Sequence, residues 1–314
     1  MLVVENLIKQ YGEFVAADGI SFVAEKGTVF GLLGPNGAGK STAINCISGL
    51  LKPTSGHISV NGHDVVSDAR RARQCLGVVP QELAIYEDLP AIDNLRYWGK
   101  AYGLRRKTLE SRVAEVLSYI GLGDRAHELP KKFSGGMKRR LNFGCGIVHK
   151  PAVLLLDEPT VGVDPQSRER LFNMVEAERD NGACILYTTH YMEEAERLCN
   201  SLAIIDRGKI IADGTVAELR AQTGARDVLQ LSGNFPVEET RSAIHDLANA
   251  KINDLEIISQ EESSLTLSLP DGSHNLAIIF DSLASAGGRV TETSLRRPNL
   301  ETLFLLLTGK ELRE

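Results

Sequence analysis

A glycine-rich run between an apolar segment and a helical one constrains this chain more than any other feature. Residues 34–42 read GPNGAGKST and directly follow Val29–Leu33, an apolar run typical of a buried parallel strand. Glycines let backbone N–H groups wrap a phosphate closely, and the helix that follows adds its positive end. Lys40 would reach the β- and γ-phosphates of ATP, and the hydroxyl of Ser41 would bind Mg²⁺. A glycine-rich hairpin turn is the alternative, but it leaves the Lys-Ser pair unexplained. The residues predicted to hold the nucleotide are Gly34, Pro35, Asn36, Gly37, Ala38, Gly39, Lys40, Ser41 and Thr42.

A second apolar run, Ala152–Leu156, ends in two adjacent carboxylates. Asp157 at the strand end is suited to bind Mg²⁺, directly or through water. Glu158, one residue on, would polarise the attacking water as a general base, a role that contributes about 10² to 10⁴-fold in rate. Such a pair is often only a strand followed by a turn. Its presence in the same domain as the phosphate loop favours the catalytic interpretation.

Three further residues could complete such a site. Gln81 follows the apolar run Leu76–Val79 and could contact both Mg²⁺ and the water. His190 follows Ile185–Thr189 and could hydrogen-bond the γ-phosphate, while Tyr11 could stack on adenine. Each has a plainer alternative: a loop glutamine, a histidine at a strand end, or an aromatic residue exposed on a strand edge. The position of His190 after another core strand favours the catalytic role.

The tripeptide Ser134-Gly135-Gly136 indicates a second anion site, because it opens the helical stretch MKRRLNFGCGIV. A serine hydroxyl and unpaired N–H groups at a helix start suit a phosphate. Only the first site has a lysine and carboxylates, so the second would serve the ATP of a partner molecule. A closed two-fold dimer would then bury two nucleotides at its interface. The basic residues nearby, within 131–140, are expected to form a solvated face.

The order of apolar and amphipathic segments predicts an α/β core with a mostly parallel sheet, followed by a small α+β domain. Residues 1–222 form the first domain, with a helical insertion over about 89–150, and residues 223–314 the second. The boundary is expected near Gln222–Arg226. The core strands are expected at Val29–Leu33, Leu76–Val79, Ala152–Leu156, Ile185–Thr189 and Leu202–Asp206, and an antiparallel layer at Leu2–Lys9, Val15–Ala24, His57–Asn61 and Lys209–Ala212.

Beyond residue 226 the pattern reads β-α-β-β-α-β, which matches the ferredoxin-like, split βαβ layout. A last helix, Leu300–Leu307, has Asn299 as its expected N-cap and Gly309 just past its end. No catalytic motif falls in this domain. Its role is expected to be accessory, in dimerisation or regulation, unless the last helix simply packs on the domain's own sheet.

Together these motifs make residues 1 to about 222 resemble the ATP-binding subunit of ABC transporters. Residues 34–42 resemble its Walker A motif and Leu154–Glu158 its Walker B motif with the catalytic glutamate. Gln81 resembles the Q-loop glutamine, His190 the switch histidine, and Tyr11 the adenine-stacking aromatic. Residues 134–138 resemble the signature, and residues 163–165 the D-loop, which adds Asp164 to the expected nucleotide-binding residues.

The forms SGGMKRRL and PNLETLFLLLTG are similar to the ATPases of daunorubicin-resistance-type exporters. The signature here reads FSGGM rather than LSGGQ, so the fifth residue, Met137, offers no strong polar contact, while the serine and glycines remain. The resemblance implies ATP and Mg²⁺ as cofactors, a homodimer or a dimer with a related ATPase, and a membrane-spanning subunit on a separate chain. The expected location is the cytoplasmic face of the cell membrane.

Composition narrows the alternatives. A net charge of −6 argues against general nucleic-acid binding, and five scattered cysteines fit reduced thiols. The longest apolar runs cover about five residues, whereas a membrane-spanning helix needs roughly 20. A soluble ABC-type mechanochemical ATPase acting on ribosomes or DNA stays open as the alternative function. A P-loop kinase or GTPase gives no role to His190 or to the helix after Ser134.

Overall fold

The computed structural model describes residues 1–222, 226–296 and 300–308. The chain divides into two compact units, Met1–Asp213 and Gly214–Glu314. The boundary expected near residue 222 therefore falls later than the observed division, and residues 223–225 lie outside the described residues. The difference arises because helix α8 (Val216–Gln222) packs against α11 (Leu300–Thr308) within the second unit.

A six-stranded sheet with the order β10-β9-β3-β8-β7-β6 forms the centre of the first unit. The pairs among β6, β7, β8, β3 and β9 are parallel. Every residue of β3, β7 and β8 is buried, as expected for parallel strands covered on both faces. The strands are β3 (Val29–Leu33), β6 (Leu76–Val79), β7 (Val153–Asp157), β8 (Cys184–Thr189), β9 (Ser201–Asp206) and β10 (Lys209–Thr215).

The prediction that Lys209–Ala212 belongs to the antiparallel layer is wrong. These residues lie in β10, at the edge of the six-stranded sheet beside β9. The reason is the two-residue turn at Arg207 and Gly208, whose φ angles are 46° and 80°. Two positive φ angles are typical of the tight turns that fold a strand directly back onto its predecessor.

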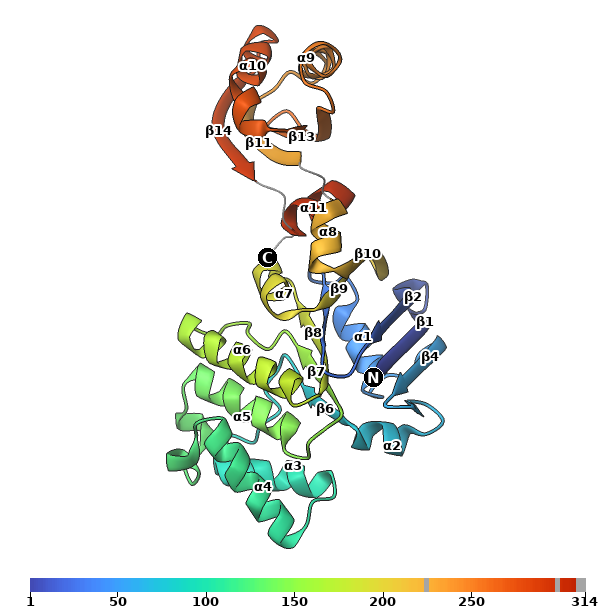
Figure 1. Cartoon of the computed structure of the whole chain (residues 1–314), viewed down its shortest axis with the longest axis vertical. Helices are drawn as coiled ribbons and strands as arrows, with labels where there is room; N and C mark the ends of the chain where they lie inside the picture. The colour runs from blue at the N-terminus through green and yellow to red at the C-terminus, as the bar shows by residue number, and fades with distance from the viewer. Residues whose placement is uncertain (223–225, 297–299, 309–314) are drawn as a thin grey trace. The chain divides into compact units, whose positions relative to one another are not determined.

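A separate antiparallel sheet has the order β2-β1-β4-β5. Helix α1 (Lys40–Ile47) lies between this layer and the six-stranded sheet (Figure 1). Its apolar residues Ala43, Ile44 and Ile47 share one hydrophobic core with residues of both sheets, which fixes the start of α1 just after β3. The strands of this layer are β1 (Leu2–Tyr11), β2 (Phe14–Ala24), β4 (Ser55–Val60) and β5 (His63–Asp64).

Helices α3, α4 and α5 gather at one end of this unit (Figure 1) and fall within the stretch expected to be a helical insertion. Helix α4 buries Leu109, Val113, Val116 and Leu117, the spacing of one helix face. The remaining helices of the unit are α2 (Ala69–Gln74), α3 (Ala91–Ala101), α4 (Arg106–Tyr119), the 3₁₀ turns Gly123–Arg125 and Pro130–Lys132, α5 (Gly135–Ile147), α6 (Pro165–Asp180) and α7 (Met192–Leu198).

The basic residues of segment 131–140 do not form a solvated face throughout. Lys131 is exposed and pairs with Asp88. Arg140, in contrast, is only 8% exposed, and its guanidinium donates to the carbonyls of Ile120 and Gly121. These carbonyls follow the end of α4, where free acceptors and the helix dipole favour a cation. Arg140 therefore turns inward and joins α5 to α4.

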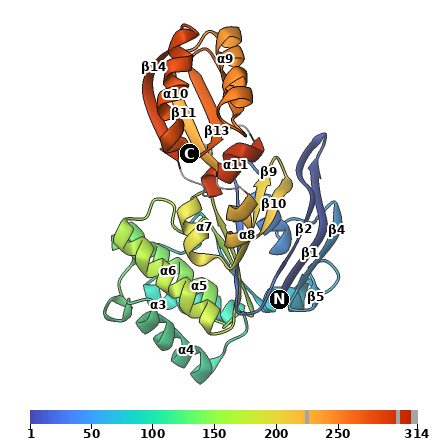
Figure 2. The ribbon, with the colours of Figure 1, turned by 45° about the horizontal axis from the view of Figure 1, so that its top comes forward.

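The second unit has the predicted β-α-β-β-α-β order, and its sheet runs β12-β13-β11-β14 with antiparallel pairs. Helices α9 and α10 lie side by side (Figure 2), and they share a core of their own with the strands, including Leu229, Leu267, Ile244 and Ile279. Asn299 and Gly309, the expected caps of the last helix, lie outside the described residues. The elements are β11 (Arg226–Asn234), α9 (Val237–Ala250), β12 (Glu256–Gln260), β13 (Ser264–Pro270), α10 (Gly272–Ser285) and β14 (Arg289–Arg296).

Candidate nucleotide-binding and catalytic site

The loop between β3 and α1 has the backbone that its glycines predict. Gly37 and Gly39 have φ angles of 81° and 108°, in the region that favours glycine. A Cβ atom at Gly39 would lie 2.4 Å from the carbonyl oxygen of Ala16, so only glycine fits there. Helix α1 starts at Lys40 with neither a side-chain cap nor an acidic residue in its first turn. The N–H groups of that turn are thus available to an anion.

The carboxylate of Glu158 is the point at which the predicted catalytic residues meet. Lys40 Nζ lies 3.0 Å from Glu158 Oε1, and both side chains are buried. Gln81 Nε2 donates to Oε2 over 3.4 Å, and His190 Nδ1 lies 3.2 Å from the same oxygen, without hydrogen-bond geometry. Lys40 also donates to the carbonyl of Gly34 at 2.7 Å. Residues from four separate motifs therefore converge within one chain.

Asp157 occupies the last position of β7 and is buried. Burial raises the pKa of Asp157, while hydrogen bonds from the hydroxyls of Thr188 and Ser41 oppose the shift. Thr188 Oγ1 donates to Asp157 Oδ1 at 2.6 Å and accepts from the N–H of Glu158 at 3.0 Å. One threonine on the neighbouring strand β8 thus holds the carboxylate of Asp157 and the backbone of Glu158.

The donors present fit MgATP. Mg²⁺ prefers oxygen ligands and completes its shell with water and substrate phosphates. Ser41, Asp157 and Gln81 supply a hydroxyl, a carboxylate and an amide, and Ser41 already contacts Asp157. No group of three or more His, Cys, Asp or Glu suited to a metal occurs in residues 1–222, 226–296 and 300–308. Magnesium binding here would therefore depend on phosphate oxygens, as in phosphoryl-transfer sites generally.

The remaining predicted binding residues lie apart from this cluster. In the described chain no hydrogen bond or ion pair joins Ser134, Gly135 or Gly136 to Lys40 or Glu158. Ser134 is the exposed N-cap of α5 and accepts from the N–H of Met137. Asp164 caps α6 beside it: a Cβ on Gly136 would lie 3.4 Å from Asp164 Oδ2. Tyr11, 46% exposed, lies at the end of β1 with Lys9 Nζ 4.9 Å from its ring centroid.

Sequence reasoning missed Thr188, Arg139 and Glu194. Arg139 on α5 donates to the carbonyls of Gln81 and Val161, so it joins the loop after β6 to the loop after β7. Its only signal was a place in a basic run, which gives no direction to a side chain. Thr188 and Glu194 act through contacts between distant segments, and no local pattern marks them.

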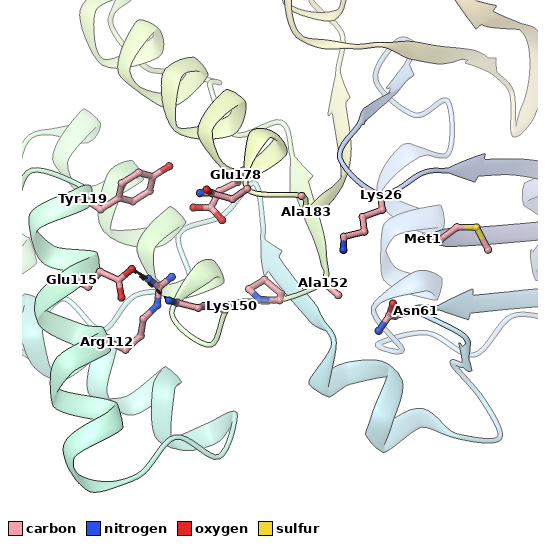
Figure 3. Close-up of a pocket in the computed structure, with 13 residues that line it drawn as sticks. Met1, Lys26, Asn61, Arg112, Glu115, Tyr119, Lys150, Ala152, Glu178 and Ala183 are labelled. Carbon is pink, nitrogen blue, oxygen red and sulfur yellow. Dashed lines mark ion pairs between the residues drawn. The ribbon is translucent and has the colours of Figure 1, made fainter.

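A pocket of about 650 Å³ lies where the parallel strands begin, at the end of the sheet opposite to the cluster around Glu158 (Figure 3). Two of its lining residues, Ala152 and Ala183, immediately precede β7 and β8, whereas Asp157 and His190 lie at or after the carboxyl ends of these strands. Two of its cationic side chains, Arg112 and Lys150, both pair with Glu115. These charges serve the contact between α4 and the end of α5, away from the phosphate loop.

In the described residues no helix combines the length and the apolar character that crossing a bilayer requires. The ABC transporter family model matches residues 17–161. The linearmycin resistance ATP-binding protein of Bacillus subtilis (strain 168) is 44% identical over 317 residues, covering 100% of both chains. A daunorubicin resistance ATP-binding protein of Streptomyces coeruleorubidus is 35% identical, covering 99% of this chain and 97% of the relative.

Solved structures agree with these relatives. The ATP-binding subunit of an ABC transporter superimposes with a TM-score of 0.66 at 34% identity, covering 71% of this chain and 93% of the other. A second ATP-binding cassette of an ABC transporter, in its ADP conformation, gives a TM-score of 0.63 at 26% identity, covering 69% and 92%. Taken with the phosphate loop and the residues around Glu158, these similarities place the chain in the ABC transporter family, as an ATP-binding subunit of the drug-exporter type.

Proposed function

We propose that this chain is the ATP-hydrolysing subunit of an exporter. It closes on two MgATP with a second copy or a related ATPase, and it drives a separate membrane-spanning partner. The observation that carries the proposal is the convergence of Lys40, Gln81 and His190 on Glu158. A lysine, an amide, an imidazole and a carboxylate at one point are the groups that phosphoryl transfer to water requires.

Each residue then has a distinct task. Lys40, released from Glu158, neutralises charge on the β- and γ-phosphates. The Glu158 carboxylate accepts a proton from the attacking water, and Gln81 and His190 orient that water and the γ-phosphate. Ser41, Asp157 and Gln81 would hold Mg²⁺, which would neutralise charge at the phosphate oxygens. Tyr11 stacks on the adenine.

The dimer follows from the exposed start of α5. Ser134 and Gly135 are exposed, and their helix end has no acidic residue in its first turn. An anion is stabilised at such a helix end. The γ-phosphate of a partner's ATP supplies that charge, so each nucleotide is held between one chain's Lys40 and the other chain's Ser134, with Asp164 beside it.

The test is the molar mass of Glu158→Gln by size-exclusion chromatography with light scattering, with and without MgATP. We expect hydrolysis to fall by about 10² to 10⁴-fold, because the general base is lost. ATP binding should persist, and the chain should shift from monomer to dimer only with MgATP. Adding Lys40→Ala or Ser134→Arg to this variant should abolish the shift. Rapid turnover by Glu158→Gln would contradict the base assignment, and a monomer with ATP bound would contradict the shared-nucleotide dimer.

The site for the membrane partner is proposed at a groove of about 270 Å³ between β6, α3 and α5. Its lining is mainly apolar and includes Trp98, Tyr102, Val78 and Leu50, the last 75% exposed. Exposed apolar groups of this kind mark protein contacts. The groove also contacts Pro80, next to Gln81, so a bound partner would be close to the catalytic cluster.

Leu50→Asp should lower the share of the chain that sediments with washed membranes of the cells that make it. A charge in an apolar contact is costly to desolvate, while the nucleotide site stays intact. Val66→Asp is the matched control, since Val66 is also exposed but does not line the groove. Equal sedimentation of both variants with wild type would place the docking surface elsewhere. Localisation at the cytoplasmic face of the membrane rests on the same result.

A further inference from the structure

A buried carboxylate on α7 joins segments that the catalytic site uses. Glu194 is 3% exposed and accepts hydrogen bonds from three hydroxyl groups. Thr160 Oγ1 donates to Oε1 at 2.7 Å, while Tyr187 Oη and Thr189 Oγ1 donate to Oε2 at 2.9 and 3.0 Å. The nearest cation, Arg168, is 3.7 Å away and lacks hydrogen-bond geometry. The hydroxyls therefore provide most of the stabilisation of this buried charge.

The three hydroxyls come from both sides of the catalytic cluster. Thr160 is two residues after Glu158. The carbonyl of Thr160 accepts from the N–H of Val163, which closes the turn at this point. Thr189 directly precedes His190, and its oxygen also accepts from the N–H of Tyr191 at 2.9 Å. The carboxylate of Glu194 thus connects the turn after the general base with the turn that carries His190.

An ionised carboxylate accepts hydrogen bonds and donates none, so it sets the direction of every hydroxyl around it. Because Thr189 must donate to Glu194, its lone pairs are left to accept from Tyr191, which fixes the backbone on both sides of His190. An amide in place of the carboxylate would present N–H groups to one of these hydroxyls. Partly satisfied buried networks lose their unique geometry.

We propose that Glu194 is a positioning residue for hydrolysis: it holds His190 and Glu158 in register by binding Thr189 and Thr160 together. Its effect is indirect, because its hydrogen bonds go to Thr160, Tyr187 and Thr189, and through them it keeps His190 in place relative to Glu158. This inference rests on the proposed ATPase function. It assigns a task to a side chain that lies outside the motifs of the phosphate loop, the general base and the signature.

The test compares Glu194→Gln with Glu193→Gln, its exposed neighbour on the same helix turn. We expect Glu194→Gln to lower kcat about 10- to 100-fold, the scale for misplaced catalytic groups. The Kd for ATP should stay near the wild-type value, since Lys40 and the phosphate loop are untouched. Glu193→Gln should match wild type. Equal kcat for both variants would overturn the proposal.

A second comparison separates positioning from general weakening of the fold. In a His190→Ala background, Glu194→Gln should lower kcat no further, because the histidine that Glu194 keeps in place relative to Glu158 is missing. If kcat of the double variant instead falls by the product of the two single losses, the proposal is overturned.

If Glu194→Gln does not fold, Thr160→Val replaces it, because it removes one donor at nearly constant volume. Thr160→Val should lower kcat, and Thr160→Ser, which keeps the hydroxyl, should restore it. Equal kcat for Thr160→Val and wild type would overturn the proposal. Absence of ATPase activity in the wild type would instead overturn the proposed function.

Discussion

At the scale of single residues, the site depends on backbone conformations that side chains disfavour. Glu158 has a φ angle of 45°, a left-handed conformation that costs an ordinary residue about 1–2 kcal/mol. Its N–H is held by the hydroxyl and the carbonyl of Thr188. The Glu158 carboxylate lies against Lys40, and the neighbouring strand holds the backbone conformation of this proposed base.

A glycine comparison tests how the phosphate loop is built. Gly39→Ala should lower the free energy of unfolding by several kcal/mol, because a Cβ would lie 2.4 Å from the Ala16 carbonyl at a φ angle of 108°. Gly103→Ala is the control: its φ angle is 92°, but nothing lies within 4 Å of the new atom. The control should lose about 1–2 kcal/mol from the backbone alone. Urea unfolding without nucleotide measures the free energy of unfolding of both variants. Equal losses would show that the backbone at Ala16 moves to accept the new Cβ without cost.

At the scale of elements, helix α5 does more than carry the proposed second anion site at its start. Arg139 binds the carbonyls of Gln81 and Val161, and Asn142 bonds Pro80 and Ala84 in the same loop. The helix therefore supports the glutamine loop at several points. Movement of α5 would carry that loop, and hence Gln81, with it.

The end of α5 predicts a dependence of stability on pH. His149 Nε2 donates to the carbonyl of Leu76, and the ring stacks on Tyr102 with centroids 3.6 Å apart. Burial lowers the pKa of His149 to about 4. The unfolded chain protonates His149 near pH 6.5, and the folded chain does so only near pH 4. The stability that neutral His149 contributes is therefore complete above pH 6.5 and is lost as the pH falls from 6.5 toward 4.

The measurement is the free energy of unfolding in urea at pH 7.5 and pH 5. His149 alone should account for a loss of about 2 kcal/mol in wild type between these values. His149→Gln should show a loss smaller by about that amount, because glutamine can still donate to Leu76 without titrating. His127→Gln, at an exposed histidine, should behave as wild type. An unchanged pH dependence in His149→Gln would contradict the assignment.

The sequence predicted those elements whose pattern is local and missed those set by distant contacts. The phosphate loop, the core strands and the β-α-β-β-α-β order follow from glycine spacing and apolar periodicity. The sequence did not predict the sheet to which Lys209–Thr215 belongs, because the same alternating pattern is expected of a strand in either layer. Nor did the inward direction of Arg140, which depends on carbonyls at the end of another helix. Of the buried partners of Glu194, Thr160 is likewise distant along the chain, 34 residues away.

At the scale of the whole molecule, each unit contains a hydrophobic core built from its own described residues. The first joins the antiparallel layer, α1 and the six-stranded sheet, and the second joins α9 and α10 to their own strands. The proposed catalytic residues all belong to the first unit.

This division has a consequence for how such a chain tolerates change over generations. Substitutions that repack Leu229, Leu267 or Ile279 alter one core and leave the side chains behind the phosphate loop as they were. Selection can therefore act on the two units at different rates. The C-terminal unit needs only to keep its own packing, while the unit that contains Lys40 and Glu158 must also keep the arrangement proposed for catalysis.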